Sequence, residues 1–379
     1  MDILYFDHSA TTKIKEEVLH EMLPFFSENY GNGSSAYSIG RSNRKVIEDA
    51  RKQVADLIGA KSREIYFTSG GSESDNTALK GFCFANKEKG RHIITSKIEH
   101  PAILESCKTL EKQGFKITYL DVDSEGIVNL ANLRKSINKQ TVLISIMYAN
   151  NEVGTIEPIK EISQIAKANN IAFHTDAVQA VGNVNIDVNS MGIDMLSLSG
   201  HKFYGPKGIG ALYVKDGINF SRYIDGGHQE KNKRAGTENV PAIVGLGKAA
   251  EIAKDNLENH KIKLQELRNY YIEQIRQNMP EAKLNGSIDN RLPGNANFSF
   301  EGVDGNAILY ELDLKGICVS TGSACSSRDT TPSHVLTSMG LNESMANGAI
   351  RATFGEENTK EQIDILVNSL KDAVEKFKL

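Results

Sequence analysis

Two residues placed at the ends of apolar runs could together hold and activate a cofactor. Lys202 ends a Ser-Gly-His-Lys motif directly after the apolar run 195–198, and Asp176 follows the run 171–175. A lysine amine can form an imine with the aldehyde of pyridoxal phosphate, and an acid can keep the ring nitrogen protonated so that the ring withdraws electrons. Taken alone, Lys202 could be a solvated loop lysine and Asp176 a helix cap. Together they predict a pyridoxal-phosphate site.

A glycine-rich segment suits an anion such as the phosphate of that cofactor. Residues 68–74, Thr-Ser-Gly-Gly-Ser-Glu-Ser, follow a predicted strand and open a predicted helix. The small residues let the backbone approach an anion, and the N–H groups and positive end of the helix hold it. A glycine turn with a serine cap has the same letters, so the position before a helix is what favours a phosphate site. Ser199 and His201, beside Lys202, are further candidates for phosphate contacts.

Three other polar side chains follow predicted strands. His100 comes after the second strand, where its ring could stack on a flat cofactor and move protons, or lie in a loop without a role. Asn151, in Asn150-Asn151-Glu152 after the fourth strand, could fix a ring oxygen or close a turn. Gln179, three residues after Asp176, could also reach the cofactor. Ligands of open sheets collect at the carboxyl ends of strands, which is where these residues are expected.

The four cysteines have different surroundings. Cys83, Cys107 and Cys318 have apolar neighbours and are expected to be buried. Cys325 instead stands in the small, polar stretch 320–332, which cannot pack a core and is expected to be mobile. None forms Cys-x-x-Cys, and so few cysteines in 379 residues are not a disulfide framework, which suits a reducing compartment. Cys325 is therefore the thiol placed to react.

Strand-like and helix-like segments alternate along most of the chain. This pattern predicts an α/β fold with a mainly parallel, seven-stranded sheet flanked by helices. The expected strands are 65–68, 92–95, 116–120, 142–148, 171–175, 195–198 and 210–214. The expected helices are 72–86, 101–112, 158–169 and a long charged helix at 241–279.

The remaining segments indicate a smaller α+β domain. Its expected strands are 295–300, 317–321 and 349–354. Its expected helices are 305–314 and 359–378. We expect a large domain over residues 15–260 and a small domain formed by residues 1–14 and 261–379. The small domain would then carry the Cys325 segment.

Composition and charge narrow the class of protein. The chain has 44 Lys+Arg against 48 Asp+Glu, a net charge of −4, so no general attraction to nucleic acid is expected. The amino terminus shows no basic region or long apolar segment, and no stretch approaches the roughly 20 apolar residues of a membrane helix. We expect a cytoplasmic enzyme without a nucleic-acid partner, a membrane partner or a metal.

The motifs together resemble those of cysteine desulfurases of the NifS/IscS type. The resemblance is carried by 199–212, Ser-Gly-His-Lys-Phe-Tyr-Gly-Pro-Lys-Gly-Ile-Gly-Ala-Leu, by 234–239, Arg-Ala-Gly-Thr-Glu-Asn, and by 320–325, Ser-Thr-Gly-Ser-Ala-Cys. It runs from Asp7-His8-Ser9-Ala10-Thr11-Thr12 to Arg351, almost the whole chain. It implies fold type I of the pyridoxal-phosphate enzymes, in the class V aminotransferase group. It also implies pyridoxal phosphate as cofactor, L-cysteine as substrate and a homodimer.

The resemblance assigns roles to single residues. It makes Lys202 the Schiff-base lysine, Asp176 the partner of the pyridine nitrogen and His100 the residue stacked on the ring. The further cofactor contacts that it implies are Gln179 and Asn151 on the ring-oxygen side, Gly71, Ser72, Ser199 and His201 on the phosphate, and Thr237 on the phosphate of the neighbouring subunit. Taken alone, Thr237 would be an ordinary loop residue.

Arg351 and Cys325 are the residues that the resemblance directs at the substrate. The resemblance implies that Arg351 binds the substrate carboxylate with its planar fork of donors and that Asn151 also contacts the substrate. Taken alone, Arg351 would be a surface arginine on a strand. Lys202 removes the α-proton, and the Cys325 thiolate attacks the substrate sulfur, with His100 as the candidate for proton transfer. The products are L-alanine and a persulfide that passes to an acceptor, such as an iron–sulfur scaffold or a tRNA-thiolation enzyme.

Two other classes of function stay open at this point. A transaminase or lyase of the same fold would use Lys202, Asp176 and Arg351 but needs no thiol, so Cys325 argues against it. A non-enzymatic sulfur carrier or scaffold would bind no yellow cofactor, which an absorbance spectrum distinguishes. The sequence does not specify the acceptor or exclude selenocysteine as a second substrate.

Overall fold

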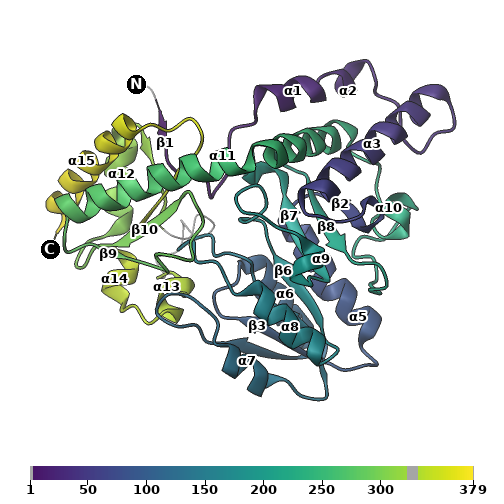
Figure 1. The fold of residues 1–379 in the computed structure, drawn as a ribbon, viewed down its shortest axis with the longest axis horizontal. Helices are drawn as coiled ribbons and strands as arrows, with labels where there is room; N and C mark the ends of the chain where they lie inside the picture. Colours follow the sequence, from purple (N-terminus) through teal and green to yellow (C-terminus); the bar gives the residue numbers. More distant parts are fainter. Residues whose placement is uncertain (1–2, 322–331, 379) are drawn as a thin grey trace.

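A seven-stranded sheet forms the centre of the computed structural model, which describes residues 3–321 and 332–378 (Figure 1). Its strand order is β2-β8-β7-β6-β5-β3-β4. Strands β3 to β7 pair in parallel, whereas β8 is antiparallel to both β2 and β7. This confirms the predicted mainly parallel sheet of seven strands. The strands are β2 Ile65–Thr68, β3 His92–Ser96, β4 Lys116–Leu120, β5 Thr141–Ser145, β6 Ala172–Asp176, β7 Met195–Ser199 and β8 Gly210–Val214.

Helices cover both faces of this sheet, so its inner strands are apolar on both sides. Successive residues point to opposite faces: Ile94 and Ile144 belong to one apolar cluster, and Ile93 and Leu143 to the other. The flanking helices are α4 Gly71–Asn76, continued through a π-helical turn Thr77–Gly81 into α5 Phe82–Asn86, then α6 Pro101–Lys112, α7 Leu130–Ser136, α8 Ile159–Ala168 and α9 Val188–Met191. Short 3-10 turns lie at Ser62–Glu64 and Gly200–Lys202.

A smaller α+β region has its own core. An antiparallel sheet of order β12-β10-β9 and a parallel pair of β1 with β11 form its strands. Phe298, Phe354 and Leu366 belong to its apolar cluster. The elements are β1 Leu4–Tyr5, β9 Lys283–Leu284, β10 Asn295–Ser299, β11 Ile317–Cys318, β12 Ala349–Thr353, α12 Gly305–Leu314, α13 His334–Ser338, α14 Glu343–Asn347 and α15 Lys360–Phe377.

The long helix α11, Val240–Asn278, runs between the two regions (Figure 1). Its first part, including Val240 and Leu246, packs in the core of the large sheet, while Leu264 and Ile275 pack in the core of the smaller region. The helix passes from the first core to the second between Ala250 and Leu264. The predicted domain boundary at residue 260 stays a prediction, because the helix passes through it without a break.

Some helices and boundaries were not expected from the sequence. The amino-terminal helices α1 Glu16–Met22, α2 Pro24–Ser27 and α3 Ser38–Leu57 were not predicted, and neither was α10 Gln229–Asn232. Strand β5 ends at Ser145 instead of 148, although Ile146 and Tyr148 still donate to carbonyls of β6. Strand β11 ends at Cys318 instead of 321, because Ser320 turns to pair with Arg351. None of the described helices combines the length and the apolar composition needed to cross a membrane.

Candidate active site

A cavity of about 270 Å³ lies where several strands of the large sheet end. Such crevices at the carboxyl ends of strands are the usual ligand sites of open α/β sheets. The residues predicted from the sequence that line it are Gly71, Ser72, His100, Asn151, Asp176, Gln179, Ser199, His201, Lys202 and Arg351. Thr237 is exposed and does not line the cavity of its own chain. Cys325 lies outside the described residues.

Lys202 reaches the cavity from the turn Gly200–Lys202 that follows β7. Its Nζ atom donates to the Ala10 carbonyl at 2.8 Å and also to the Ser9 carbonyl. These acceptors belong to the amino-terminal motif at residues 7–12, for which the sequence predicted no role. The amine is therefore directed by backbone carbonyls from a segment about two hundred residues away in the sequence.

Asp176, at the end of β6, is a nearly buried carboxyl group. The Val178 N–H donates to its Oδ1 atom at 2.9 Å. Burial raises the pKa of Asp176, whereas His100 and Lys202 act to lower it. A carboxylate held by a backbone donor and facing cationic groups can accept a proton from, or share one with, a ligand nitrogen.

His100 caps the amino terminus of α6. The Ala102 N–H donates to its Nδ1 atom at 3.1 Å, so in the neutral ring the hydrogen is on Nε2. Burial lowers the pKa of His100, and the charge of Asp176, which acts to raise it, offsets this only in part. The imidazole is therefore fixed in one tautomer beside Asp176.

Another group of residues in the cavity wall suits an anion. A Cβ atom added to Gly71 would lie 2.6 Å from a Val178 methyl carbon, so the backbone approach there depends on glycine. The hydroxyls of Ser72 and Ser199 and the ring of His201 line the same cavity. Burial, with Lys202 and Lys207, lowers the pKa of His201 to about 4, so this ring offers a neutral donor near pH 7.

The amides near the cavity divide between a turn and the cavity wall. Asn150 closes a turn, because its Oδ1 atom accepts the N–H groups of Glu152 and Val153 at 2.8 and 3.0 Å. Asn151 lines the cavity instead, and its carbonyl accepts from Arg351 at 2.9 Å. Gln179 donates from Nε2 to the Ser9 carbonyl at 2.9 Å. The structure therefore shows the turn at Asn150, and the contact of Asn151 with a ring oxygen stays a prediction.

Arg351 is buried, so the alternative that it is a surface arginine is wrong. It stands in the middle of β12, is 1% exposed, and its Nη2 atom lies 2.5 Å from Asp7 Oδ1. The ion pair joins residues at the two ends of the chain, and Arg351 lines the cavity. A planar guanidinium in this position suits a carboxylate ligand.

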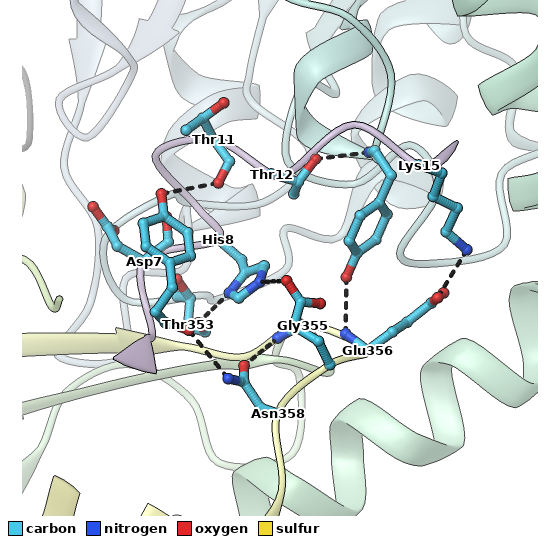
Figure 2. Close-up of polar contacts among 12 residues, drawn as sticks. Asp7, His8, Thr11, Thr12, Lys15, Thr353, Gly355, Glu356 and Asn358 are labelled. Carbon is cyan, nitrogen blue, oxygen red and sulfur yellow. Dashed lines mark hydrogen bonds and ion pairs between the residues drawn. The ribbon is translucent and has the colours of Figure 1, made fainter. Parts of the chain in front are cut away.

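The amino-terminal segment is held in place by the polar network drawn in Figure 2. His8 contacts the Thr353 carbonyl at 2.9 Å through Nδ1 and Glu357 at 3.0 Å through Nε2. Lys15 pairs with Glu356 at 2.8 Å. This network holds in place the carbonyls that accept hydrogen bonds from Lys202 and the Asp7 carboxylate that pairs with Arg351. The sequence analysis missed this role, although the motif at residues 7–12 was the signal for it.

Both flanks of the segment that contains Cys325 lie at the cavity. Ser320 exchanges backbone hydrogen bonds of 3.1 and 2.7 Å with Arg351. On the other side, the Ser333 hydroxyl donates to Glu152 at 2.5 Å, and His334 Nε2 donates to the Glu99 carbonyl at 3.0 Å. His334 and Glu152 line the cavity and were not predicted, because nothing in their local sequence distinguishes them.

Comparison with known proteins adds to this geometry. A family profile described as aminotransferase class-V matches residues 4–366. The chain is 54% identical over 369 residues to a cysteine desulfurase IscS from Clostridium botulinum (strain Hall), covering 97% of this chain and 93% of that protein. A solved NifS-like protein superposes with a TM-score of 0.93 at 37% identity, covering 99% and 100% of the two chains. A structure described as SspA in complex with cysteine gives 0.84 at 39% identity, covering 94% and 100%.

Proposed function

Because the chain belongs to the class-V aminotransferase family and, within it, to the cysteine desulfurases, we propose that it removes sulfur from L-cysteine with pyridoxal phosphate bound in this cavity. The family predicted from the motifs is confirmed. The observation that carries the proposal is the convergence of Lys202, Asp176 and His100, from three strand ends, on one cavity that also contains Arg351. A solved relative described as a complex with cysteine supports the choice of substrate.

The residues of the cavity fit pyridoxal phosphate. The nearly buried Asp176 suits the ring nitrogen, and the Gly71 cradle with Ser72, Ser199 and His201 suits the phosphate. Lys202 faces the same space and supplies the amine. Gln179 and Asn151 would contact the ring-oxygen side. When bound, pyridoxal phosphate supplies an aldehyde for the amine and a ring that withdraws electrons from the substrate.

The side chains on the cofactor wall then have separate tasks. Lys202 would hold the cofactor through its amine and, once free, would remove the α-proton of the substrate. Asp176 would keep the ring nitrogen protonated, because an anion at this position favours the charged ring. His100 would lie against the ring and would carry protons through Nε2, the nitrogen that does not accept from Ala102.

Arg351 and Cys325 act on the substrate. Arg351 binds the cysteine carboxylate, with Asn151 beside it. Cys325 follows Ser320, the backbone partner of Arg351, by five positions in the sequence. The Cys325 thiolate attacks the substrate sulfur, the carbon–sulfur bond breaks, and L-alanine leaves while the enzyme keeps a persulfide.

The proposal also covers the oligomeric state of the protein, its compartment and the acceptor of the sulfur. We propose a homodimer in which Thr237 of each chain contacts the phosphate held by its partner, since Thr237 is exposed and away from its own cavity. A reactive thiol persists in a reducing compartment, which favours the cytoplasm. The persulfide passes to an acceptor protein for iron–sulfur cluster assembly or thionucleotide synthesis.

The experiment that tests the function joins three readouts on the purified protein. We expect a yellow protein whose label maps to Lys202 after borohydride reduction, equimolar L-alanine and sulfide from L-cysteine with a reductant, and a persulfide on Cys325 after single turnover without one. A transaminase would instead turn over without Cys325. A label on another amine, or alanine formation without sulfur transfer, would contradict the proposal.

A further inference from the structure

A second carboxyl group, Asp75, lies in the wall of the cavity and has no part in the function proposed above. It stands on α4, three positions after Ser72, and both residues line the cavity. Asp75 is 1% exposed, and its Oδ1 atom has no hydrogen-bond partner among the described residues. Buried polar atoms without a partner are rare, so this carboxyl group calls for a physical explanation.

The groups around Asp75 are those that face the cofactor position. The nearest ligand atoms of Asp75, His100 and Asp176 lie within 4.8 Å of one another. His174 Nε2 lies 3.8 Å from Asp75 Oδ1, and the buried Glu99 adds a further carboxyl group nearby. Strands β2, β7 and β8, which also pack against α4, carry no charged residue within their described ranges. The charged residues of α6, another neighbour of α4, are exposed to solvent.

The two aspartates differ in what stabilises a negative charge. Asp176 accepts the Val178 N–H, and the positive charge of Lys202 lowers its pKa. These contacts favour an ionised Asp176 even though burial raises its pKa. The ionised form is the one that a protonated ring nitrogen requires.

Asp75 lacks such support among the described residues. Burial raises the pKa of Asp75, the charge of Asp176 raises it further, and a hydrogen bond from the Ser197 side chain opposes them only in part. His174 supplies no positive charge at neutral pH, because burial lowers its pKa to about 3. Two adjacent carboxylates in a buried site repel each other strongly, so one of them keeps a proton. Of the two, Asp75 is the one that no cationic group in the described part of the chain supports.

We propose that Asp75 is a positioning residue that keeps its proton at neutral pH and donates it as a hydrogen bond to the carboxylate of Asp176. The proposal rests on the proposed function, in which Asp176 faces the cofactor ring. A neutral donor stabilises the charge of Asp176 without adding a second charge. It also makes Asp176 a weaker base, so that the shared proton stays on the ring nitrogen.

Infrared spectra of the apoprotein test the protonation of the pair without the cofactor. At pH 7 the wild type should show the carbonyl stretch of a buried, protonated carboxylic acid that Asp75→Asn loses. Glu157→Gln is the matched control, because Glu157 is also buried with a raised pKa but does not line the cavity. This control should remove its own band and leave that of Asp75. A difference spectrum in which Asp75→Asn removes no such band overturns the proposal.

A pH titration of the visible absorbance of the holoenzyme shows which aspartate holds the proton. The variant Asp75→Asn keeps a neutral donor of the same shape and should leave the titration midpoint within about 0.3 pH units of the wild type. The variant Asp75→Leu removes the donor, which makes Asp176 more basic and should raise the midpoint by roughly one unit, a tenfold change in proton affinity.

An ionised Asp75 would move the titration midpoint in the opposite direction. If Asp75 were ionised, Asp75→Asn would remove a negative charge beside the ring and lower the midpoint, which overturns the proposal. Asp75→Asn alone suffices for this decision if Asp75→Leu does not fold. Failure of the infrared or absorbance test would remove the role of Asp75 and leave the desulfurase function, which alanine, sulfide and persulfide measurements test separately.

Discussion

The two walls of the cavity are built differently. The cofactor wall, with Asp176, Lys202 and His100, comes from the ends of β6, β7 and β3 of one sheet, and backbone groups fix each side chain. The substrate wall is assembled from remote segments by side-chain pairs, such as Asp7 with Arg351, which are 344 positions apart. The cofactor wall therefore depends on strand order and, at Lys202, on carbonyls of the amino-terminal segment, and the substrate wall depends on long-range side-chain pairs. Substitutions should separate cofactor binding from turnover accordingly.

Lys202→Ala should have the largest effect, because it removes the amine proposed to hold the cofactor and to act as the base of the reaction. We expect a loss of about 10⁴-fold in kcat/KM, at the upper end of what a general base contributes, together with loss of borohydride trapping. The exposed Lys207, five positions later, provides the matched control as Lys207→Ala, which should stay within about twofold of the wild type. Trapping that persists in Lys202→Ala would place the cofactor on another amine.

Cys325→Ala should abolish sulfur transfer while leaving the cofactor wall intact. We expect a loss of about 10³-fold in sulfide release, as for removal of a nucleophile, with an unchanged visible spectrum. Cys318→Ala is the control, because this thiol lies seven positions earlier on β11 and outside the cavity. Sulfide release by Cys325→Ala at the wild-type rate would rule out the role of this thiol.

Arg351→Lys should weaken substrate binding without releasing the cofactor. The lysine keeps the charge but loses the planar fork, and a lost charge-assisted hydrogen bond corresponds to a rise in KM of about 10- to 100-fold. Asp7→Asn removes the carboxylate that holds the guanidinium and should raise KM by less, about three- to tenfold. Steady-state kinetics with cysteine measures both. A change in cofactor affinity in either variant would break the distinction between the two walls.

The smallest expected effect is a pH-dependent contribution of the buried His174 to the free energy of unfolding. His174 is buried and neutral with a pKa of about 3, so the unfolded chain binds a proton that the folded chain does not once the pH falls below about 6.5. The stability that neutral His174 contributes is present above about pH 6.5 and is lost as the pH falls toward 3. The destabilisation caused by His174→Asn should therefore shrink by about 2 kcal/mol between pH 7 and pH 5. Urea unfolding of the apoprotein at both values measures it, and a destabilisation independent of pH would contradict a neutral His174.

The cofactor wall could be predicted closely from the sequence. Each of its residues follows an apolar run, and strands of one parallel sheet end at the same edge, so local position along the chain was sufficient. Three predicted strands of this sheet have the observed boundaries, and the boundaries of the other four differ by one to three residues. The substrate wall was predicted only through family motifs, because nothing in the sequence around Arg351 identifies Asp7 as its partner.

Helices α1 to α3 were missed, although Ile47, Val54 and Leu57 of α3 recur at helical spacing and are buried. Other features had no local signal. Asp75 looked like a polar residue on the first turns of a helix, and only its burial beside Asp176 distinguishes it. His334 and Glu152 reached the cavity through contacts between segments that the sequence keeps far apart.

Local patterns in the sequence predict the alternation of strands and helices, the parallel sheet and the strand-end residues, because apolar periodicity and turn residues act over a few positions. The folded arrangement alone shows which carbonyls accept hydrogen bonds from Lys202, which carboxylate pairs with Arg351 and which acid lies beside Asp176. Those contacts join residues that are up to 344 positions apart, and their energies depend on burial and distance. Neither quantity exists until the chain has folded.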